Sequence, residues 1–443
     1  MRERIALLMI ITCLWVFLFI FQNYFNTFWA IVTLMLFMTI YTIYMQIAFK
    51  HQVRKKRKNP PVINESYKPF VSIMIPAHNE ATVIHKTIEN VLQLNYENYE
   101  VIVIDDRSDD DTAVIIKELS NKYEKVEALV RDKSAFPGKS AVLNDAMKIA
   151  KGEAILVFDA DARIEPNFLK DLVPALEPDD VGAVQARKVI ANRAHNFLTK
   201  CQDNEMALDT HFQVGRDAVK GAVELRGNGE LIKRTALNDI EGWNNYTITD
   251  DLDMSTRLHI KGWDVRFCPD VCVYEEGVLA YWPLVRQRRR WIEGSIRRYL
   301  EHFTEVLTSK EISLRVSLDM TAYISEFILP FWLMSEICFQ IFRFVKGYDN
   351  QILSSCALAV AMCAFFTSAL LYSLRKYNKL KLMQNIWQSV QTCLYIVVLW
   401  FPIVVFIVFK IIFAKKTMDW GKTAHGVLEP AQILVQESVT QEV

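Results

Sequence analysis

Residues 154–161 read Ala-Ile-Leu-Val-Phe-Asp-Ala-Asp, five apolar residues followed by two carboxylates one residue apart. A short apolar run without polar interruption is typical of a strand that is buried on both faces, as in a parallel sheet. Two similar runs, residues 71–75 and 100–104, lie upstream, and polar residues and then a stretch of helical periodicity follow each of them. This alternation predicts an α/β fold with a doubly wound, Rossmann-like sheet, whose ligands bind beyond the carboxyl ends of the strands.

The paired acids Asp159 and Asp161 stand at the end of the predicted strand, where the ligands of such a sheet gather. When a nucleoside diphosphate leaves, negative charge builds on its oxygens, and a divalent cation held by carboxylates neutralises that charge. Two acids in this spacing also occur in solvated turns and helix caps. The position after a buried strand favours the metal site, and we predict that both carboxylates bind a divalent cation.

Polar residues follow the other two predicted strands, in residues 76–80 and 105–108. A carboxylate at this edge of the sheet can accept hydrogen bonds from a uracil N–H or from ribose hydroxyls, so these residue types suit a nucleoside pocket. The alternative is that Asp106 or Ser108 only caps the next helix. The candidates for substrate binding in these two segments are Pro76, Asn79, Glu80 and Asp106.

A short turn, residues 137–140, reads Pro-Gly-Lys-Ser and is followed by Asn144. Its Lys139 is a candidate for contact with a phosphate, and Asn144 is a further candidate for substrate binding. The turn lacks the spacing of a P-loop, which excludes an ATPase.

Residues 249–253 read Thr-Asp-Asp-Leu-Asp and precede a stretch of helical periodicity. Acids at the start of a helix can be there only because the helix N-terminus favours negative charge. In a site of sugar transfer, one of them can instead be the base that takes a proton from the acceptor hydroxyl. The catalytic candidates are Asp251 and Asp250.

A basic and aromatic segment, residues 287–294, reads Gln-Arg-Arg-Arg-Trp-Ile-Glu-Gly. One interpretation is an amphipathic helix at the membrane surface, with arginines at anionic headgroups. The other is a catalytic role, and the two can hold on different faces of one helix.

Apolar segments at both ends of the chain predict a membrane protein. Residues 5–22 and 28–49 are each long enough to cross a bilayer, and the basic run 51–58 then places the middle of the chain in the cytoplasm. Residues 321–342, 351–374 and 386–413 are apolar again. Basic residues flank the last of these on both sides, so it either crosses once with the tail outside or lies partly in the interface, and the count stays open at four or five spans.

The domain boundaries follow from these segments. We expect two N-terminal spans in 1–50, a basic linker in 51–69, the catalytic domain in 70–277, interfacial helices in 278–320, a C-terminal membrane region in 321–413 and a tail in 414–443. The 51 basic and 51 acidic residues balance, which gives no support to a nucleic-acid partner. The eight cysteines lack paired CxxC spacing, so neither disulfides nor a zinc site is expected.

Taken in order, the acids after the first two strands, the Asp-Ala-Asp, the Thr-Asp-Asp and the Gln-Arg-Arg-Arg-Trp resemble the signature of family 2 glycosyltransferases of the cellulose, chitin and hyaluronan synthase group. The resemblance covers residues 70–300 and implies a GT-A fold, a UDP-sugar donor, Mg²⁺ or Mn²⁺, and inversion at the anomeric carbon. It assigns Asp106 to the uridine, Asp159 and Asp161 to the metal and diphosphate, and Asp251 to the general base. It assigns diphosphate and acceptor contacts to Gln287, Arg290 and Trp291. Many synthases have Glu where this chain has Asp250.

A closer resemblance is to glycolipid synthases of the cyanobacterial type, which glucosylate diacylglycerol from UDP-glucose. It rests on residues 181–188, 224–229, 248–253 and 420–425, and it adds Gly227 and Asn228 to the candidates for substrate binding. It implies a bacterial inner or thylakoid membrane. A processive synthase that exports a growing glycan remains open, because Glu326 and Glu336 could line a polar tunnel. A membrane receptor that only binds nucleotide sugars is disfavoured because every acid of the motifs is present.

Overall fold

The structure is a computed structural model, and it describes residues 5, 7–9, 11–13, 16, 27–58, 64, 66–348, 352–414 and 416. Most of the predicted first span (5–22) and almost all of the predicted tail (414–443), with the motif at 420–425, lie outside these residues.

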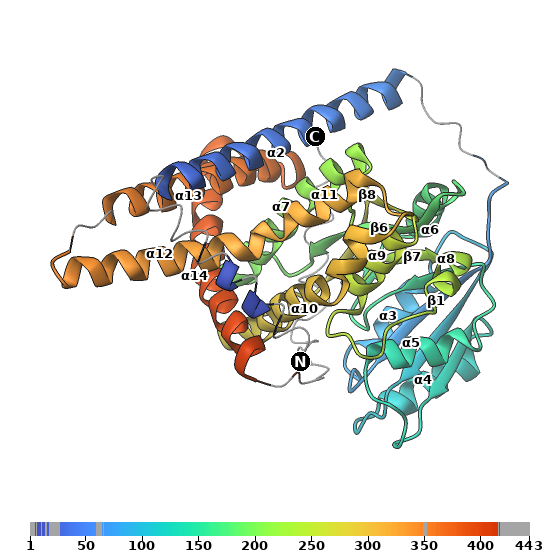
Figure 1. The fold of residues 1–443 in the computed structure, drawn as a ribbon. Helices are drawn as coiled ribbons and strands as arrows, with labels where there is room; N and C mark the ends of the chain where they lie inside the picture. Colours follow the sequence, from blue (N-terminus) through green and yellow to red (C-terminus); the bar gives the residue numbers. More distant parts are fainter. Residues whose placement is uncertain are drawn as a thin grey trace.

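An eight-stranded mixed sheet forms the centre of the catalytic part, in the order β3-β2-β1-β4-β7-β6-β8-β5 (Figure 1). Strands β3, β2, β1 and β4 run parallel to one another, and β7 pairs antiparallel with both β4 and β6. The strands are β1 (Val71–Ala77), β2 (Tyr99–Asp105), β3 (Val126–Val130), β4 (Ala154–Val157), β5 (Arg163–Ile164), β6 (Val181–Ile190), β7 (Glu230–Lys233) and β8 (Asp264–Glu275). The predicted α/β, GT-A-like sheet is confirmed, with the three quoted apolar runs as β1, β2 and β4.

Alternate side chains of the central strands fill two separate cores, one on each face of the sheet. Ile73 and Ile75 lie in the core beneath α3 (Ile84–Val91) and α4 (Thr112–Lys122). Met74 lies in the opposite core, with residues of α5 (Lys139–Met147). Because successive side chains of a strand point to opposite faces, a strand covered on both sides needs an uninterrupted apolar run.

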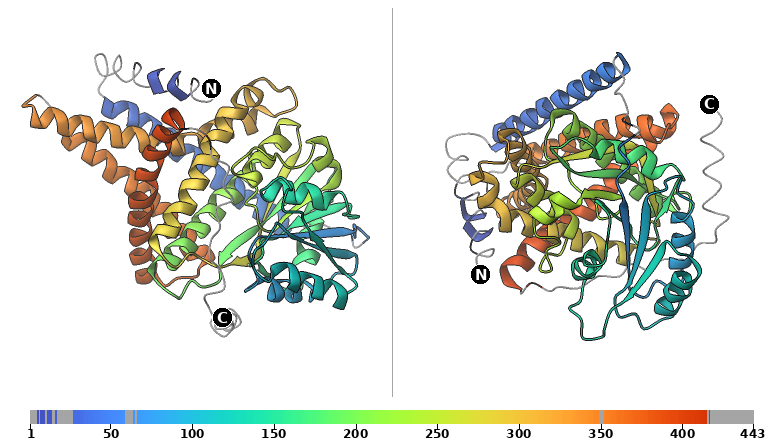
Figure 2. Two further views of the ribbon diagram at one scale, coloured as in Figure 1. Left: turned by 90° about the horizontal axis from the view of Figure 1, so that it is seen from below. Right: turned by 90° about the vertical axis from the view of Figure 1, so that its right-hand side faces the viewer.

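Two long helices connect the sheet to the membrane part. Helix α7 (Phe197–Val219) contacts β6 and β8 on one side and α2, α13 and α14 on the other. Helix α10 (Tyr281–Thr308) packs against both α9 (Asp250–Ile260) and α14. Figures 1 and 2 show the sheet on one side of these helices and α12, α13 and α14 on the other. Shorter helices α6 (Phe168–Leu172) and α8 (Arg234–Asp239) and a 3₁₀ turn at Val173–Leu176 complete the catalytic part.

Three candidate transmembrane helices are present among the described residues, at Leu314–Val345, Ile352–Tyr377 and Leu382–Phe413. They indicate a membrane protein. The first contains α11 (Leu314–Tyr323) and α12 (Ser325–Val345), the others are α13 and α14. The predicted segment 386–413 belongs to the single helix α14, which passes through Pro402 without a break.

Helix α2 (Thr27–Lys58) contains the predicted second apolar segment together with the basic run 51–58. The basic residues expected in a linker therefore form the last turns of a helix. Tyr41 of α2 donates a 2.6 Å hydrogen bond to Asp319 of α11, which joins the N-terminal helix to the C-terminal ones.

Candidate active site

A single cavity of about 350 Å³ runs from the strand ends of the sheet to the membrane helices. Of the residues proposed from the sequence, those that line it are Pro76, Glu80, Lys139, Asp159, Asp161, Gly227, Asp250, Asp251, Gln287, Arg290 and Trp291. They come from segments up to 215 positions apart, between Pro76 and Trp291. The cavity therefore brings most of the predicted site together at the edge where ligands of such sheets bind.

Asp159 and Asp161 follow β4 and line the cavity floor. The ammonium of Lys139 lies 2.7 Å from Asp159 Oδ1 and donates to the carbonyl of Gly227 at 2.8 Å. Burial by itself lowers the pKa of Lys139, but the carboxylates of Asp159, Asp250 and Glu230 outweigh burial and raise it. Lys139 is thus a fixed positive charge beside the paired acids.

Asp250 and Asp251 occupy the first turn of α9, where the helix N-terminus favours negative charge. No side chain caps this helix. Burial, followed by the neighbouring charge of Asp250, raises the pKa of Asp251 to about 6. A carboxylate with a pKa in this range is still ionised at neutral pH and is a much better proton acceptor than an ordinary aspartate.

Glu230, on β7, is a further acid beside Asp250 and Lys139 that the sequence reasoning missed, although it does not itself line the cavity. It is fully buried, and burial together with Asp250 raises its pKa to about 8. Oε1 of Glu230 and Oδ2 of Asp250 are buried without a hydrogen-bond partner among the described residues. Glu230 belongs to a short strand that contains both polar and apolar residues, so the neighbouring sequence does not indicate a functional role for it.

These carboxylates fit a divalent cation. The donor atoms are oxygens, which Mg²⁺ and Mn²⁺ prefer. Oδ2 of Asp250 is buried without a hydrogen-bond partner among the described residues, which leaves an oxygen acceptor here that Lys139 does not satisfy. Asp159 and Asp161, which follow β4, are candidates to hold it, and both line the open cavity.

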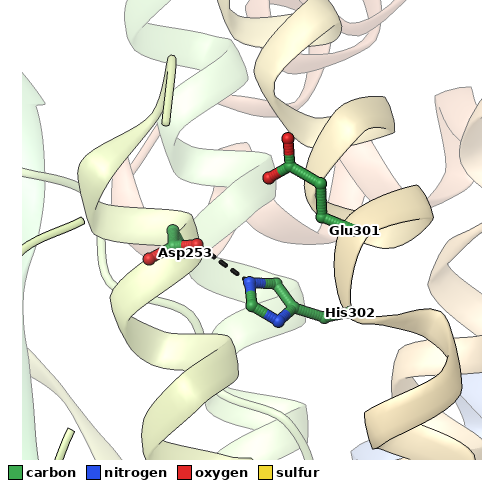
Figure 3. A group of neighbouring side chains, drawn as sticks. All are labelled: Asp253, Glu301 and His302. Carbon is green, nitrogen blue, oxygen red and sulfur yellow. Dashed lines mark hydrogen bonds and ion pairs between the residues drawn. The ribbon is translucent and has the colours of Figure 1, made fainter. Parts of the chain in front are cut away.

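The side chains of a second cluster of possible metal ligands form hydrogen bonds and ion pairs with neighbouring residues of the protein. Figure 3 shows Asp253 of α9 facing Glu301 and His302 of α10. His302 Nε2 lies 2.9 Å from Asp253, Arg257 lies 2.7 Å from the same carboxylate, and Lys416 lies 2.7 Å from Glu301. Each acid already has a cationic partner, so the cluster serves to dock α10 on α9.

Helix α10 carries the segment 287–294, and one of its faces lines the cavity through Gln287, Arg290 and Trp291. Arg288 is buried, pairs with Glu205 of α7 at 2.7 Å, and stacks at 4.1 Å from the Trp291 ring centre. One of the two interpretations of the sequence has the arginines of this segment contact lipid headgroups. For Arg288 the structure excludes this, because its guanidinium lies inside the protein.

Four candidates do not line the cavity. Asp106 is fully buried and pairs with Arg131 at 2.6 Å and with Arg107 at 2.9 Å. Neither Asp106 nor Ser108 caps the next helix, since α4 begins at Thr112. Asp106 instead anchors the loop after β2, where its Oδ2 also accepts from the Gly138 N–H at 3.4 Å.

The other three hold the loops of the site together. Asn79 receives a 2.7 Å hydrogen bond from the Asp109 N–H and so joins the loops after β1 and β2. Asn144 bonds the backbone of Trp243 at 2.8 Å and 3.0 Å. Asn228 is buried, and its side-chain oxygen accepts from the Asp159 N–H at 3.2 Å, which fixes the start of the paired acids. These positions orient the lining residues.

Lys188 and Glu275 also line the cavity and form a 2.8 Å ion pair. Neither was a candidate from the sequence. Glu275 and Glu276 stand at the carboxyl end of β8, so the rule that singled out Asp159 would have found them if the strand had been recognised.

The membrane side of the cavity has a polar wall and an apolar wall. The polar wall includes Glu205, Asp209, Arg216, Glu224, Arg226, Tyr323 and Glu326. The apolar wall comes from α12, α13 and α14 and includes Pro330, Phe366, Ile396, Trp400, Phe401 and Val404. Trp400 donates a 3.0 Å hydrogen bond to Glu205, so the last membrane helix is tied to the residue that holds Arg288.

Comparison with known proteins agrees with this arrangement. The chain is 38% identical over 363 residues to a β-monoglucosyldiacylglycerol synthase of Trichormus variabilis, covering 81% of this chain and 76% of the relative. It is 32% identical over 380 residues to the synthase of that name from Synechocystis, covering 84% and 78%. A solved mannosyltransferase of Pyrobaculum calidifontis, in complex with GDP-Man and Mn²⁺, shares the fold with a TM-score of 0.58 and 19% identity, over 82% of this chain and 98% of that one.

The profile described as "Glycosyltransferase like family 2" matches residues 69–294, which span the sheet, both acidic motifs and the cavity-lining part of α10. With this match and the similarity over four fifths of the chain, the protein belongs to glycosyltransferase family 2 and is a membrane enzyme of that family.

Proposed function

We propose that this enzyme transfers glucose from UDP-glucose to 1,2-diacylglycerol and forms β-monoglucosyldiacylglycerol. The observation that carries the proposal is the cavity that joins the paired acids after β4, the acids of α9 and the apolar wall of α12 to α14. A sugar donor is polar and its lipid acceptor is not, so their meeting point needs both kinds of surface. The names of the two cyanobacterial relatives agree with this substrate pair.

At the donor end, Asp159 and Asp161 would hold Mg²⁺ or Mn²⁺, and Lys139, Gln287 and Arg290 line the same cavity. A divalent cation held there would neutralise the charge that develops on the diphosphate of UDP as it leaves. Trp291 borders the cavity on α10, where a sugar or the acceptor can pack against its ring.

Asp251 acts as the general base. It takes the proton of the diacylglycerol hydroxyl while that oxygen attacks the anomeric carbon and the bond from this carbon to the diphosphate oxygen breaks. Attack opposite the leaving group inverts the configuration and gives the β-linkage. The raised pKa of Asp251, about 6, suits a base that works near neutral pH.

Diacylglycerol has one free hydroxyl at headgroup level and two chains that stay in the bilayer. Its enzyme must therefore hold a soluble donor against the membrane surface. We place the catalytic domain on the cytoplasmic side, because the basic end of α2, with Arg54, Lys55 and Arg57, follows the positive-inside rule.

A processive polysaccharide synthase is the competing proposal, and it needs a polar tunnel through the membrane helices. Glu326 lines the cavity, but Glu336 is buried, accepts a 2.7 Å hydrogen bond from Gln340 and does not line it. The two acids that suggested a tunnel thus do not share one channel, which favours a single transfer.

The test is a product analysis with purified protein in mixed micelles. UDP-glucose, UDP-galactose and UDP-N-acetylglucosamine are each offered with and without diacylglycerol, and products are weighed by mass spectrometry. The proposal expects one hexose added per diacylglycerol, from UDP-glucose, and no further addition. A ladder of masses or a water-soluble polymer would replace it by the synthase.

A further inference from the structure

Helix α14 is held to the catalytic part at both of its ends. Near its N-terminus, the side-chain oxygen of Gln388 accepts a 2.7 Å hydrogen bond from Arg193, in the loop between β6 and α7. Near its C-terminus, the ammonium of Lys410 lies 2.6 Å from the carboxylate of Glu293 on α10. Gln388 and Lys410 are 22 positions apart, which is about 33 Å along a helix.

Polar contacts also join the middle of α14 to α7. Thr392 accepts a 2.9 Å hydrogen bond from Asn204. Tyr395 and Trp400 both donate to the carboxylate of Glu205, at 3.3 Å and 3.0 Å. The first half of α14 therefore rests on polar side chains of α7.

The second half of α14 runs beside α10. The contacts are Phe406 with Arg289, whose guanidinium lies 4.2 Å from the ring centre, Lys410 with Glu293, and Lys416, just after the helix, with Glu301 at 2.7 Å. The paired positions differ by 117, 117 and 115 residues. Because this difference stays nearly constant, the two helices run side by side in the same direction.

A crossing of the bilayer would separate these contacts. The hydrocarbon core is about 30 Å thick, so a spanning α14 would place Gln388 at one face of the bilayer and Lys410 at the other. Their partners belong to one catalytic part, since the loop of Arg193 follows β6 of the sheet and α10 packs against α9. A folded domain with a charged surface does not extend through the hydrocarbon core. Both ends of α14 must therefore lie on the side of the sheet.

The direction of α14 and its flanking charges agree with this. In Figure 1, α2 and α12 run across the view, whereas α14, in red, runs down it. If the candidate span α12 follows the bilayer normal, α14 follows the membrane plane. Lys379 and Lys381 precede α14, and Lys410 and Lys416 stand at its end. The positive-inside rule favours one and the same side for both groups, which a single crossing cannot satisfy.

We propose that α14 does not cross the bilayer: it lies in the membrane surface, with its outer face on the lipid acyl chains and both ends on the side of the catalytic domain. The outer face is an exposed apolar stripe that includes Met383, Trp387, Leu394, Val398, Phe409 and Phe413. Neighbours in this series are 4, 7 or 11 positions apart, which places them on one face of the helix.

This orientation sets the depth of the cavity in the membrane. Trp400, Phe401 and Val404 of α14 belong to the apolar wall of the cavity. A helix in the membrane surface holds this wall near the level of the lipid headgroups. The inference goes beyond the proposed function, since it depends on neither the sugar nor the acceptor.

The experiment measures the depth of α14 by electron paramagnetic resonance. The full-length protein carries one spin label at a time at Met383, Val398 or Phe413, coupled to a non-natural ketone amino acid so that the native cysteines stay unlabelled. In lipid vesicles, collisions of the label with oxygen and with a water-soluble nickel chelate give its depth. The three labels should lie at the same depth within about 5 Å, one helical turn. A spanning helix would place Val398 about 15 Å deeper than both end positions, at the centre of the core.

The matched control is α13, the neighbouring candidate span, labelled at its exposed positions Leu353, Ala364 and Tyr372. Ala364 lies in the middle of α13 and should be the deepest of the three. A depth maximum at Val398, like that at Ala364, would overturn the inference. None of the labelled residues lines the cavity, and the measurement needs no substrate. A flat depth profile in a protein that makes no glucosyl lipid would therefore refute the proposed function alone.

Discussion

Gly227 stands against the carboxylate of Asp251: a Cβ at position 227 would lie 3.1 Å from Asp251 Oδ2. The glycine also has φ +74°, a backbone conformation that L-residues with a side chain rarely adopt. Its carbonyl meanwhile accepts the hydrogen bond from Lys139. Gly227 therefore lies between the proposed base, Asp251, and Lys139, which pairs with Asp159.

Gly227→Ala should reduce kcat about tenfold, because a shift of Asp251 by a few tenths of an ångström misplaces the base. It should also lower the free energy of unfolding by about 1–2 kcal/mol through backbone strain. Gly347→Ala is the matched control, with φ +72° and no atom within 4 Å of the added Cβ. Gly347→Ala should lower the stability measured by thermal unfolding by a similar amount, and it should keep full activity. Equal activity of the two variants would contradict the steric role.

Asp251→Asn should abolish transfer and leave binding of UDP-glucose nearly intact. The amide keeps the size of the side chain but cannot accept the acceptor's proton, and the loss of a general base costs about 10² to 10⁴ in rate. The measurements are initial rates and donor binding by calorimetry. Retention of more than about a tenth of the rate would move the role to Asp250.

Chelation with EDTA should abolish activity, and Mg²⁺ or Mn²⁺ should restore it. The leaving diphosphate develops negative charge, and a cation held by Asp159 and Asp161 is needed to offset it. Asp161→Asn should weaken donor binding as well as rate, unlike Asp251→Asn, since it removes charge from the proposed cation site. Isothermal titration of Mn²⁺ and of UDP with each variant separates the two roles. Full turnover in excess EDTA would refute the metal assignment.

Activity should fall as the pH drops through about 6. Burial and Asp250 raise the pKa of Asp251 to about 6, and the base works only in its unprotonated form, so protonation below this pH removes it. Asp250→Asn removes one cause of the raised pKa and should move this acid limb to lower pH. The check is kcat against pH for both proteins at saturating metal. An acid limb that stays in place in Asp250→Asn would assign it to another group.

Much of the fold followed from local pattern. The apolar runs that became β1, β2 and β4 are buried on both faces, and this burial is what makes a strand sequence uninterrupted. The acids proposed after β4 and at the start of α9 line one cavity, and those after β4 lie at the sheet edge where ligands are expected from strand direction. The apolar C-terminal segments likewise correspond to three long helices.

Other assignments needed contacts between distant parts of the chain. Asp106 and Asn144 have the residue types of a binding site, yet Asp106 pairs with Arg131 and Asn144 with the backbone of Trp243. Glu230 was missed because its position beside Asp250 follows from the pairing of β7 with β4 and β6.

The sequence by itself determined the α/β class and the apolar ends and singled out the candidate acids, because each depends on residue type and periodicity over a few neighbouring positions. Tertiary structure decided which charges are neutralised. Arg288 pairs with Glu205, 83 positions away, and Arg226 with Asp209, 17 positions away. The physical reason is that desolvation and Coulomb energies depend on distance in space and on burial, and the order of residues along the chain fixes neither.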